Sequence, residues 1–292
     1  MSAATTAPTT IAVLGTGRMG EPIARNLLAA GFPVRVWNRT VAKTRRLGAA
    51  GAQIGPTPVT AAAGAQVLIT MLADGRVTER AIEGALTALA PGAVWVQMGT
   101  VGLEWTERLA AISHEQGVAF VDAPVSGSDG PARAGQLVIL AAGDASLGDR
   151  LRPIFGAIGR RTVWAGPVGT GTALKLALNA WLAAITEAAA ETVALSEKLG
   201  LDPRLFVDTL ADLPLAAPYA LAKARAMIGR QFEPGFTLRL AHKDVELALS
   251  AAGRHGLRLP VIEQVDERWD AAIAHGHGDQ DVAVAVQETR SR

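Results

Sequence analysis

Short, nearly continuous hydrophobic runs recur along the first half of the chain, and longer amphipathic segments separate them. The runs cover residues 11–14, 34–37, 67–72, 94–98, 119–121 and 138–141. Such runs are typical of strands in a parallel sheet that is covered on both faces. The segments between them have helical length and periodicity: 19–30, 41–50, 77–88 and 103–116. This alternation predicts an α/β domain, a Rossmann-type doubly wound parallel sheet, over residues 11–167.

The pattern changes after Gly166-Pro167. Segments 172–200, 203–211, 218–228, 238–256 and 261–274 all have helical character, and no convincing strand remains. Residues 168–292 are therefore predicted to form an all-α C-terminal domain. Its first helix, from Thr172 to about Lys198, is apolar on most sides, as a helix between domains or subunits would be. Because the helical half has little material to cover it, we expect a homodimer or higher homo-oligomer.

Composition excludes several classes of partner and chemistry. The chain has 292 residues, 49% of them hydrophobic, with a formal net charge of +1. That balance gives no electrostatic reason to expect nucleic acid or an acidic membrane. Absence of cysteine excludes disulfides and thiolate chemistry and is compatible with the cytoplasm. No apolar run reaches the roughly 18 residues of a membrane span, and residues 1–10 are predicted to be a disordered tail without the features of an export signal.

A glycine fingerprint, Gly15-x-Gly17-x-x-Gly20, follows the first hydrophobic run and opens the first helical segment. Three glycines at this spacing are a weak signal alone, but the strand before them and the helix after them make it strong. The glycines permit a tight turn and close approach of a pyrophosphate to the helix N-terminus. A dinucleotide cofactor is therefore predicted.

The end of the second run indicates which dinucleotide. An NAD site usually has Asp or Glu there, whereas an arginine accommodates the 2′-phosphate of NADP. This chain has Asn38-Arg39-Thr40, with Lys43 one turn further. These residues favour NADP; the alternative is that Arg39 and Lys43 are solvated surface charges.

Two further segments carry candidate chemistry. The sixth run leads into Ser126-Gly127-Ser128, whose hydroxyl and backbone N–H groups suit a substrate carboxylate, although such a segment is more often an ordinary turn. Lys175 and Asn179 lie four residues apart on one face of the long helix, among apolar residues. Burial lowers the pKa of a lysine, which makes Lys175 a candidate proton donor.

From residue 11 to about 286 the chain resembles the β-hydroxyacid dehydrogenase family, which includes 3-hydroxyisobutyrate dehydrogenase, tartronate semialdehyde reductase and glyoxylate/succinic semialdehyde reductases. Four motifs carry the resemblance, in this order: the glycine fingerprint, Asp122-Ala123-Pro124-Val125-Ser126-Gly127, Gly169-Thr170-Gly171-Thr172-Ala173-Leu174-Lys175 with Asn179, and His242-Lys243-Asp244.

The resemblance implies roles for individual residues. Lys175 is implied to be catalytic, and Ser126, Gly127, Ser128, Asn179 and Thr100 are implied or expected to contact the substrate. The expected cofactor-binding residues are Gly15, Thr16, Gly17, Arg18, Met19, Gly20, Asn38, Arg39, Thr40, Lys43, Met71, Leu72, Ala73, Thr100 and Lys243. Hydride would pass from NADPH to the carbonyl of a small oxo-acid or semialdehyde, while Lys175 protonates the alkoxide.

Three alternatives stay open at this point. Imine reductases share the fingerprint and the Asn-Arg-Thr element, although they usually carry another residue where Lys175 stands. A decarboxylating sugar-acid dehydrogenase would need a longer helical domain, and a non-catalytic NADP sensor would not need the Lys175/Asn179 pair. Ser128 and Leu178 replace the Gly and Asn of many relatives, which bears on substrate specificity. His275 and His277 lack a third ligand partner, so no metal is predicted.

Overall fold

The computed structural model describes residues 9–290, so that residues 1–8, most of the predicted tail, lie outside the described residues. The chain divides into two compact units, Met1–Lys175 and Leu176–Arg292. The division lies inside the long helix α8 (Thr170–Lys198), a few residues after the predicted boundary at 167/168.

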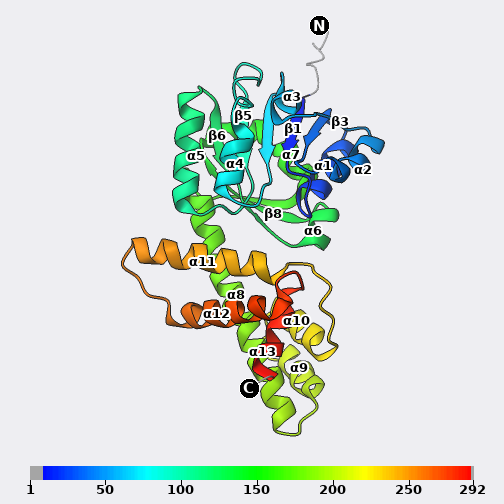
Figure 1. Cartoon of the computed structure of the whole chain (residues 1–292), viewed down its shortest axis with the longest axis vertical. Helices are drawn as coiled ribbons and strands as arrows, with labels where there is room; N and C mark the ends of the chain where they lie inside the picture. Colours follow the sequence, from blue (N-terminus) through cyan, green and yellow to red (C-terminus); the bar gives the residue numbers. More distant parts are fainter. Residues whose placement is uncertain (1–8, 291–292) are drawn as a thin grey trace. The chain divides into compact units, whose positions relative to one another are not determined.

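The first unit is built around one sheet (Figure 1). Its strands are β1 (Ile11–Leu14), β2 (Val34–Trp37), β3 (Gln53–Ile54), β4 (Val67–Thr70), β5 (Val94–Gln97), β6 (Ala119–Asp122), β7 (Val125–Ser126), β8 (Leu137–Gly143) and β9 (Gly159–Trp164). They are ordered β3-β2-β1-β4-β5-β6-β8-β7, with β9 beside β8. The six strands from β3 to β6 are parallel, which confirms the predicted Rossmann-type sheet.

The far edge of the sheet departs from the prediction of a purely parallel sheet. Strand β8 is antiparallel to β6 and β7, and β9 is parallel to β8. Strands β3 and β7 have only two residues each, and β9 begins Gly-Arg-Arg, so none of the three forms a hydrophobic run. Short or polar edge strands carry no periodic signal, which is why the sequence did not reveal them.

Helices cover both faces of the sheet because successive strand residues point to opposite sides. Ile11 and Val13 of β1 pack in one cluster with residues of α1 (Gly20–Ala29), α2 (Arg45–Ala49) and α7 (Gly148–Ile158). Ala12 and Leu14 pack in a second cluster with residues of α3 (Pro58–Ala62), α4 (Gly75–Ile82) and α5 (Leu103–Glu115). Shorter segments are η1 (Val41–Lys43), α6 (Asp129–Arg133) and η2 (Ala145–Leu147). Both faces of every central strand are therefore buried, as the continuous hydrophobic runs require.

Two predicted helices are shorter than expected. Segment 41–50 is interrupted at Thr44, whose hydroxyl donates to the Val41 carbonyl at 2.8 Å, so that η1 ends before α2 begins. Segment 77–88 ends as a helix at Ile82, because Glu83 leaves helical backbone geometry and Gly84 has a φ of +69°. A threonine side chain in the first segment and a glycine in the second therefore end helices that the periodicity predicted to be longer.

The second unit is helical, as predicted. From α8 the chain continues through α9 (Pro203–Ala211), α10 (Pro218–Ile228), α11 (Leu238–Arg254), α12 (Pro260–Ala272), η3 (Ile273–His277), η4 (Val282–Ala285) and α13 (Val286–Arg290). Ala183 of α8 packs with α11 and α12, and Val193 packs with α9 and α10. Between residues 176 and 290 the structure contains no strand, only an isolated bridge between Thr237 and Asp281.

By its length and composition alone, helix α8 could cross a membrane, although its sequence contains no uninterrupted apolar run of that length. Core helices of soluble proteins share this length and composition, however, and Glu187 in this helix is buried in an ion pair with Arg268 of α12, at 2.5 Å. That contact places this part of α8 in the core of the helical unit, against α12.

Candidate functional site

The three fingerprint glycines are required for different reasons. A Cβ on Gly15 would lie 2.3 Å from the Met71 carbonyl oxygen, and one on Gly20 would lie 1.8 Å from the Gly15 carbonyl oxygen. Gly15 also has a φ of +99°, which favours glycine. Gly17 is different, because a Cβ there would meet nothing within 4 Å. Two glycines thus permit the tight turn, and the third leaves open space at the N-terminus of α1.

Asn38 connects this loop to the end of β2. Its Oδ1 accepts a hydrogen bond from the Thr16 N–H at 3.1 Å, and its Nδ2 donates to the Thr40 carbonyl at 3.1 Å. The Thr16 hydroxyl donates to the Lys43 carbonyl at 3.4 Å. The predicted cofactor residue Asn38 therefore uses both ends of its amide within the chain, and its clear role is to position the glycine loop.

A pocket of about 360 Å³ opens beside this loop. Its lining combines four cationic side chains with one carboxylate and three small residues: Arg18, Lys43, Arg46, Arg133, Glu21, Thr16, Gly17 and Ala42. The formal charge of the lining is strongly positive, which suits a phosphorylated ligand. Thr16, Gly17, Arg18 and Lys43 were predicted to bind the cofactor, whereas Arg46 and Arg133 were not. Arg39 is exposed and does not line this pocket.

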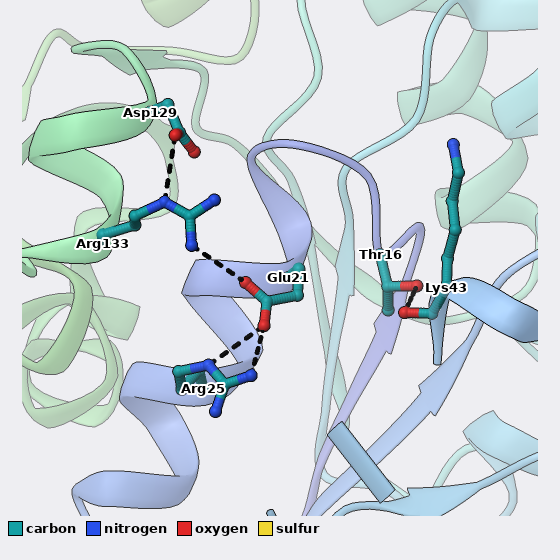
Figure 2. A network of polar contacts seen from close by, with 6 residues as sticks. All are labelled: Thr16, Glu21, Arg25, Lys43, Asp129 and Arg133. Carbon is teal, nitrogen blue, oxygen red and sulfur yellow. Dashed lines mark hydrogen bonds and ion pairs between the residues drawn. The ribbon is translucent and has the colours of Figure 1, made fainter. Parts of the chain in front are cut away.

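The carboxylate in the pocket is held by arginines on both sides (Figure 2). Glu21 accepts from Arg25 at 2.5 Å, and its other oxygen lies 4.0 Å from Arg133. Arg133 also donates from Nε to Asp129 at 3.0 Å. These contacts connect α1 with α6, the short helix that follows Ser126-Gly127-Ser128, and offset the negative charge that Glu21 places near the N-terminus of α1.

The loop after β4 lies against the glycine loop, and the loop after β5 lies against the loop after β4. A buried network holds the second of them: Gln97 accepts from Thr70 at 2.8 Å and donates to the Gly99 carbonyl at 2.9 Å. A Cβ on Gly99 would lie 2.8 Å from the Leu72 carbonyl oxygen. The predicted cofactor segment Met71-Leu72-Ala73 and the segment of Thr100 are therefore neighbours at the carboxyl ends of the strands, where such sheets bind ligands.

Asp122 holds the start of α8 against the end of β6. It is almost fully buried; its Oδ2 accepts from the Thr172 N–H at 2.7 Å and its Oδ1 accepts from the Thr172 hydroxyl at 2.8 Å. Burial raises the pKa of Asp122 to about 6, against the opposing effect of the two Thr172 hydrogen bonds. Gly171 permits this close approach, since a Cβ there would lie 2.3 Å from the Leu140 carbonyl oxygen. Asp122 therefore fixes the helix end that carries Lys175, three residues further on.

The segment after Asp122 carries the predicted substrate residues. Ser126 lies in β7, and Gly127 follows with a φ of +126°. A Cβ on Gly127 would lie 2.9 Å from Leu137, so only glycine fits this turn without movement. Ser128 precedes α6 and makes no capping hydrogen bond there.

Lys175 and Asn179 are both on α8, four positions apart, with Lys175 half-buried and Asn179 buried. In the second unit, Asn179 donates from Nδ2 to Asp244 Oδ2 at 2.6 Å, and Lys243 Nζ lies 2.8 Å from Asp244 Oδ1. A carboxylate can face only the NH₂ side of an amide, which fixes the orientation of Asn179. The sequence indicated Asp244 only as the last residue of the His242-Lys243-Asp244 motif. Its place beside Lys243 was the feature that could have indicated that it pairs with a functional residue.

His275, one of the two histidines set aside as metal ligands, has a carboxylate partner, and so does His242 of the fourth motif. His275 Nδ1 lies 2.7 Å from Glu288 Oε1, and His242 Nε2 lies 2.9 Å from Asp266 Oδ1. Across residues 9–290, no three His, Cys, Asp or Glu side chains gather in a group that could hold a metal.

Both halves of the chain match known families of dehydrogenase domains. Residues 10–166 match the family described as the NAD binding domain of 6-phosphogluconate dehydrogenase, and residues 169–288 match the family described as NAD-binding of NADP-dependent 3-hydroxyisobutyrate dehydrogenase.

Whole-length relatives support this result. An uncharacterized oxidoreductase of Bacillus subtilis, YfjR, is 36% identical over 95% of this chain and 98% of its own length. Glyoxylate/succinic semialdehyde reductase 2 of Arabidopsis thaliana, a chloroplastic protein, is 33% identical over 96% of this chain and 79% of its own length. The structure of Mycobacterium tuberculosis 3-hydroxyisobutyrate dehydrogenase with L-serine has a TM-score of 0.90 at 30% identity, covering 97% of this chain and 100% of that one.

The glycine loop, the cationic pocket beside it and these matches lead to one assignment. The chain belongs to the β-hydroxyacid dehydrogenase family, and it is an NAD(P)-dependent oxidoreductase that acts on hydroxyl or carbonyl groups.

Proposed function

We propose that the protein is an NADPH-dependent reductase of small oxo-acids or semialdehydes, with Lys175 as the proton donor. The observation that carries the cofactor choice is the pocket beside the glycine loop, in which cationic side chains outnumber the single carboxylate, Glu21, and that carboxylate is already paired with arginines. The residues present fit the dinucleotide, since the open space at Gly17 adjoins the N-terminus of α1, and helix N-termini favour phosphate groups.

Bound NADPH would supply the hydride, and the side chains would supply position and charge stabilisation. Ser126, Gly127 and Ser128 offer two hydroxyl groups and backbone N–H groups to the carboxylate of the substrate. Thr100, held in place by the Gln97 network, adds a hydroxyl at the neighbouring loop. This cradle favours substrates with one carboxylate and a carbonyl a few atoms away.

Lys175 would donate a proton to the alkoxide that forms from the carbonyl oxygen. Its place is set by Asp122, which fixes the first turn of α8 through Thr172. Asn179 has its NH₂ group committed to Asp244, so its carbonyl oxygen remains the end that can accept a hydrogen bond from lysine or substrate. Lys243 is proposed to reach the cofactor. We place the enzyme in the cytoplasm as a homo-oligomer.

The first test measures cofactor preference. We expect kcat/KM with NADPH to exceed that with NADH, and Arg39→Ala to reduce the ratio by about tenfold to a hundredfold, the value of a charge-assisted hydrogen bond. Equal use of the two cofactors by the wild type would refute the assignment. An unchanged ratio in Arg39→Ala would exclude Arg39 from the recognition of the 2′-phosphate.

The second test concerns Lys175. Loss of a general acid lowers the rate by roughly a hundredfold to ten-thousandfold, so Lys175→Ala should lose turnover to that extent while its NADPH Kd stays near that of the wild type. Lys198→Ala, at the other end of α8, is the matched control and should keep full activity. Near-normal turnover by folded Lys175→Ala would exclude the lysine as proton donor.

The third test separates carbonyl from imine reduction. NADPH oxidation should be measured with glyoxylate, succinic semialdehyde, methylmalonate semialdehyde, tartronate semialdehyde and a cyclic imine. We expect glyoxylate or succinic semialdehyde to be reduced better than the hydroxylated tartronate semialdehyde, because Leu178 replaces a polar Asn and an unpaired buried hydroxyl costs about 1–3 kcal/mol. Faster reduction of the imine than of every acid would establish an imine reductase instead.

A further inference from the structure

Arg46 is a cation in the pocket beside the glycine loop that no sequence motif indicated. It is exposed at the start of α2, three positions after Lys43, and both side chains line the pocket. Lys43 ends η1 and Arg46 lies in the first turn of α2, and both line the pocket, whereas Arg45 does not. Ala42, a small residue, lines the pocket beside this pair.

The donors of Lys43 and Arg46 are uncommitted within the described residues. No hydrogen bond or ion pair engages the Lys43 ammonium or the Arg46 guanidinium there, whereas Glu21, the one carboxylate of the pocket lining, is already paired with Arg25 and Arg133. Two unneutralised cations that face one pocket repel each other, and an anion between them would remove that repulsion. The pocket is therefore arranged to receive an anionic group beside Lys43.

We propose that Arg46 acts with Lys43 as a specificity-determining residue that binds the 2′-phosphate of the dinucleotide. This inference rests on the proposed use of NADPH. Lys43 is a compact charge, whereas the planar guanidinium of Arg46 can donate two parallel hydrogen bonds to a phosphate. Lys43 is tied to the glycine loop, because its carbonyl accepts from the Thr16 hydroxyl, and Asn38 joins the Thr16 N–H to the end of β2, the position at which dinucleotide-binding sheets hold the ribose.

The experiment compares Arg46→Gln with Arg45→Gln, its neighbour of equal charge outside the pocket. Calorimetry gives the Kd of each variant for 2′,5′-ADP, which carries the 2′-phosphate, and for ADP, which lacks it. For Arg46→Gln we expect 2′,5′-ADP to bind about tenfold or more weakly and ADP to change by less than about twofold. For Arg45→Gln we expect both ligands to change by less than about twofold, since it alters only the surrounding surface charge.

Each other outcome overturns the proposal. If Arg46→Gln weakened the binding of ADP and of 2′,5′-ADP equally, the residue would contact the pyrophosphate instead. If Arg46→Gln and Arg45→Gln had equal effects, Arg46 would contribute only to the general surface charge. A wild-type protein that binds ADP as tightly as 2′,5′-ADP would refute the NADPH assignment itself. A wild type that prefers 2′,5′-ADP, together with an unaffected Arg46→Gln, would refute only the role of Arg46.

Discussion

Gly17 and Gly20 lie three residues apart in one loop, yet their missing side chains have different consequences. Gly20 is required by the backbone, because its Cβ would lie 1.8 Å from the Gly15 carbonyl oxygen, whereas a Cβ on Gly17 would extend into open space. We expect Gly20→Ala to destabilise the fold by about 2 kcal/mol or more through overpacking. Gly17→Ala should unfold like the wild type and bind NADPH more weakly. Urea denaturation and NADPH titration of both variants test this; equal stabilities would contradict it.

Asp122 gives the first unit a pH-dependent stability. Its pKa in the folded protein is about 6, above the usual 3.8, so the folded state binds more protons than the unfolded chain between those values. The contribution of Asp122 to stability is therefore largest below about pH 4 and falls as pH rises to about 6, by roughly 3 kcal/mol in total.

Asp122→Asn removes this titration and keeps the size of the side chain. We expect the difference in unfolding free energy between wild type and Asp122→Asn to shift against the wild type between pH 4 and pH 7, and to be constant above that. Urea denaturation across this range measures it. A difference that does not change with pH would show that Asp122 does not titrate in this window.

At the scale of elements, α8 combines a mostly apolar surface with a buried ion pair. Glu187 pairs with Arg268 at 2.5 Å and accepts from Trp269 Nε1 at 3.0 Å, and burial raises the pKa of Glu187 despite the nearby arginine. Arg268→Met would leave this carboxylate buried without its cation, at a cost of about 3–5 kcal/mol.

The control is Arg258→Met, which breaks an ion pair with Glu263 at an exposed position. Exposed pairs contribute only about 0–1 kcal/mol, so this variant should keep nearly wild-type stability. Thermal unfolding monitored by circular dichroism compares the two variants. An Arg268→Met loss no greater than that of Arg258→Met would show that the buried pair does not hold α8 to α12.

At the scale of the whole molecule, exposed apolar side chains are distributed unevenly. Of the fifteen large hydrophobic residues that are exposed in the described part of the chain, eleven lie in residues 176–290, although that unit is the smaller one. They include Leu195, Leu199, Leu205 and Leu215. Because clusters of exposed apolar residues mark association surfaces, we expect this unit to form the contact of a homodimer or larger assembly.

Light scattering at micromolar concentration tests the assembly. The wild type should have at least twice the mass of one chain, 30.2 kDa, and a Leu195→Glu/Leu205→Glu double variant should be smaller. Val41→Glu, at an exposed apolar position of the first unit, is the control and should leave the mass unchanged. A stable wild-type monomer would refute the prediction.

Local patterns in the sequence were enough to predict the fold class. The runs that became β1 and β2 have the same bounds in the structure, as do the helices Pro203–Ala211 and Pro218–Ile228. Hydrophobic periodicity and Pro or Gly at segment ends are properties of neighbouring residues, so they can be recognised without knowledge of the tertiary fold. The glycine fingerprint could be recognised for the same reason, because the strand, the loop and the helix follow one another directly in the chain.

Tertiary structure alone decided which distant residues meet. Thr172 lies 50 positions from Asp122, Asp244 lies 65 positions from Asn179, and the pocket brings Arg46 and Arg133 to a loop that begins at Thr16. The run that became β8 was predicted to join a parallel sheet and is antiparallel to β6, since a hydrophobic run does not indicate the direction of its strand. Contacts of this kind depend on how strands and helices pack, and packing is set by the summed burial of many residues rather than by any motif in the chain.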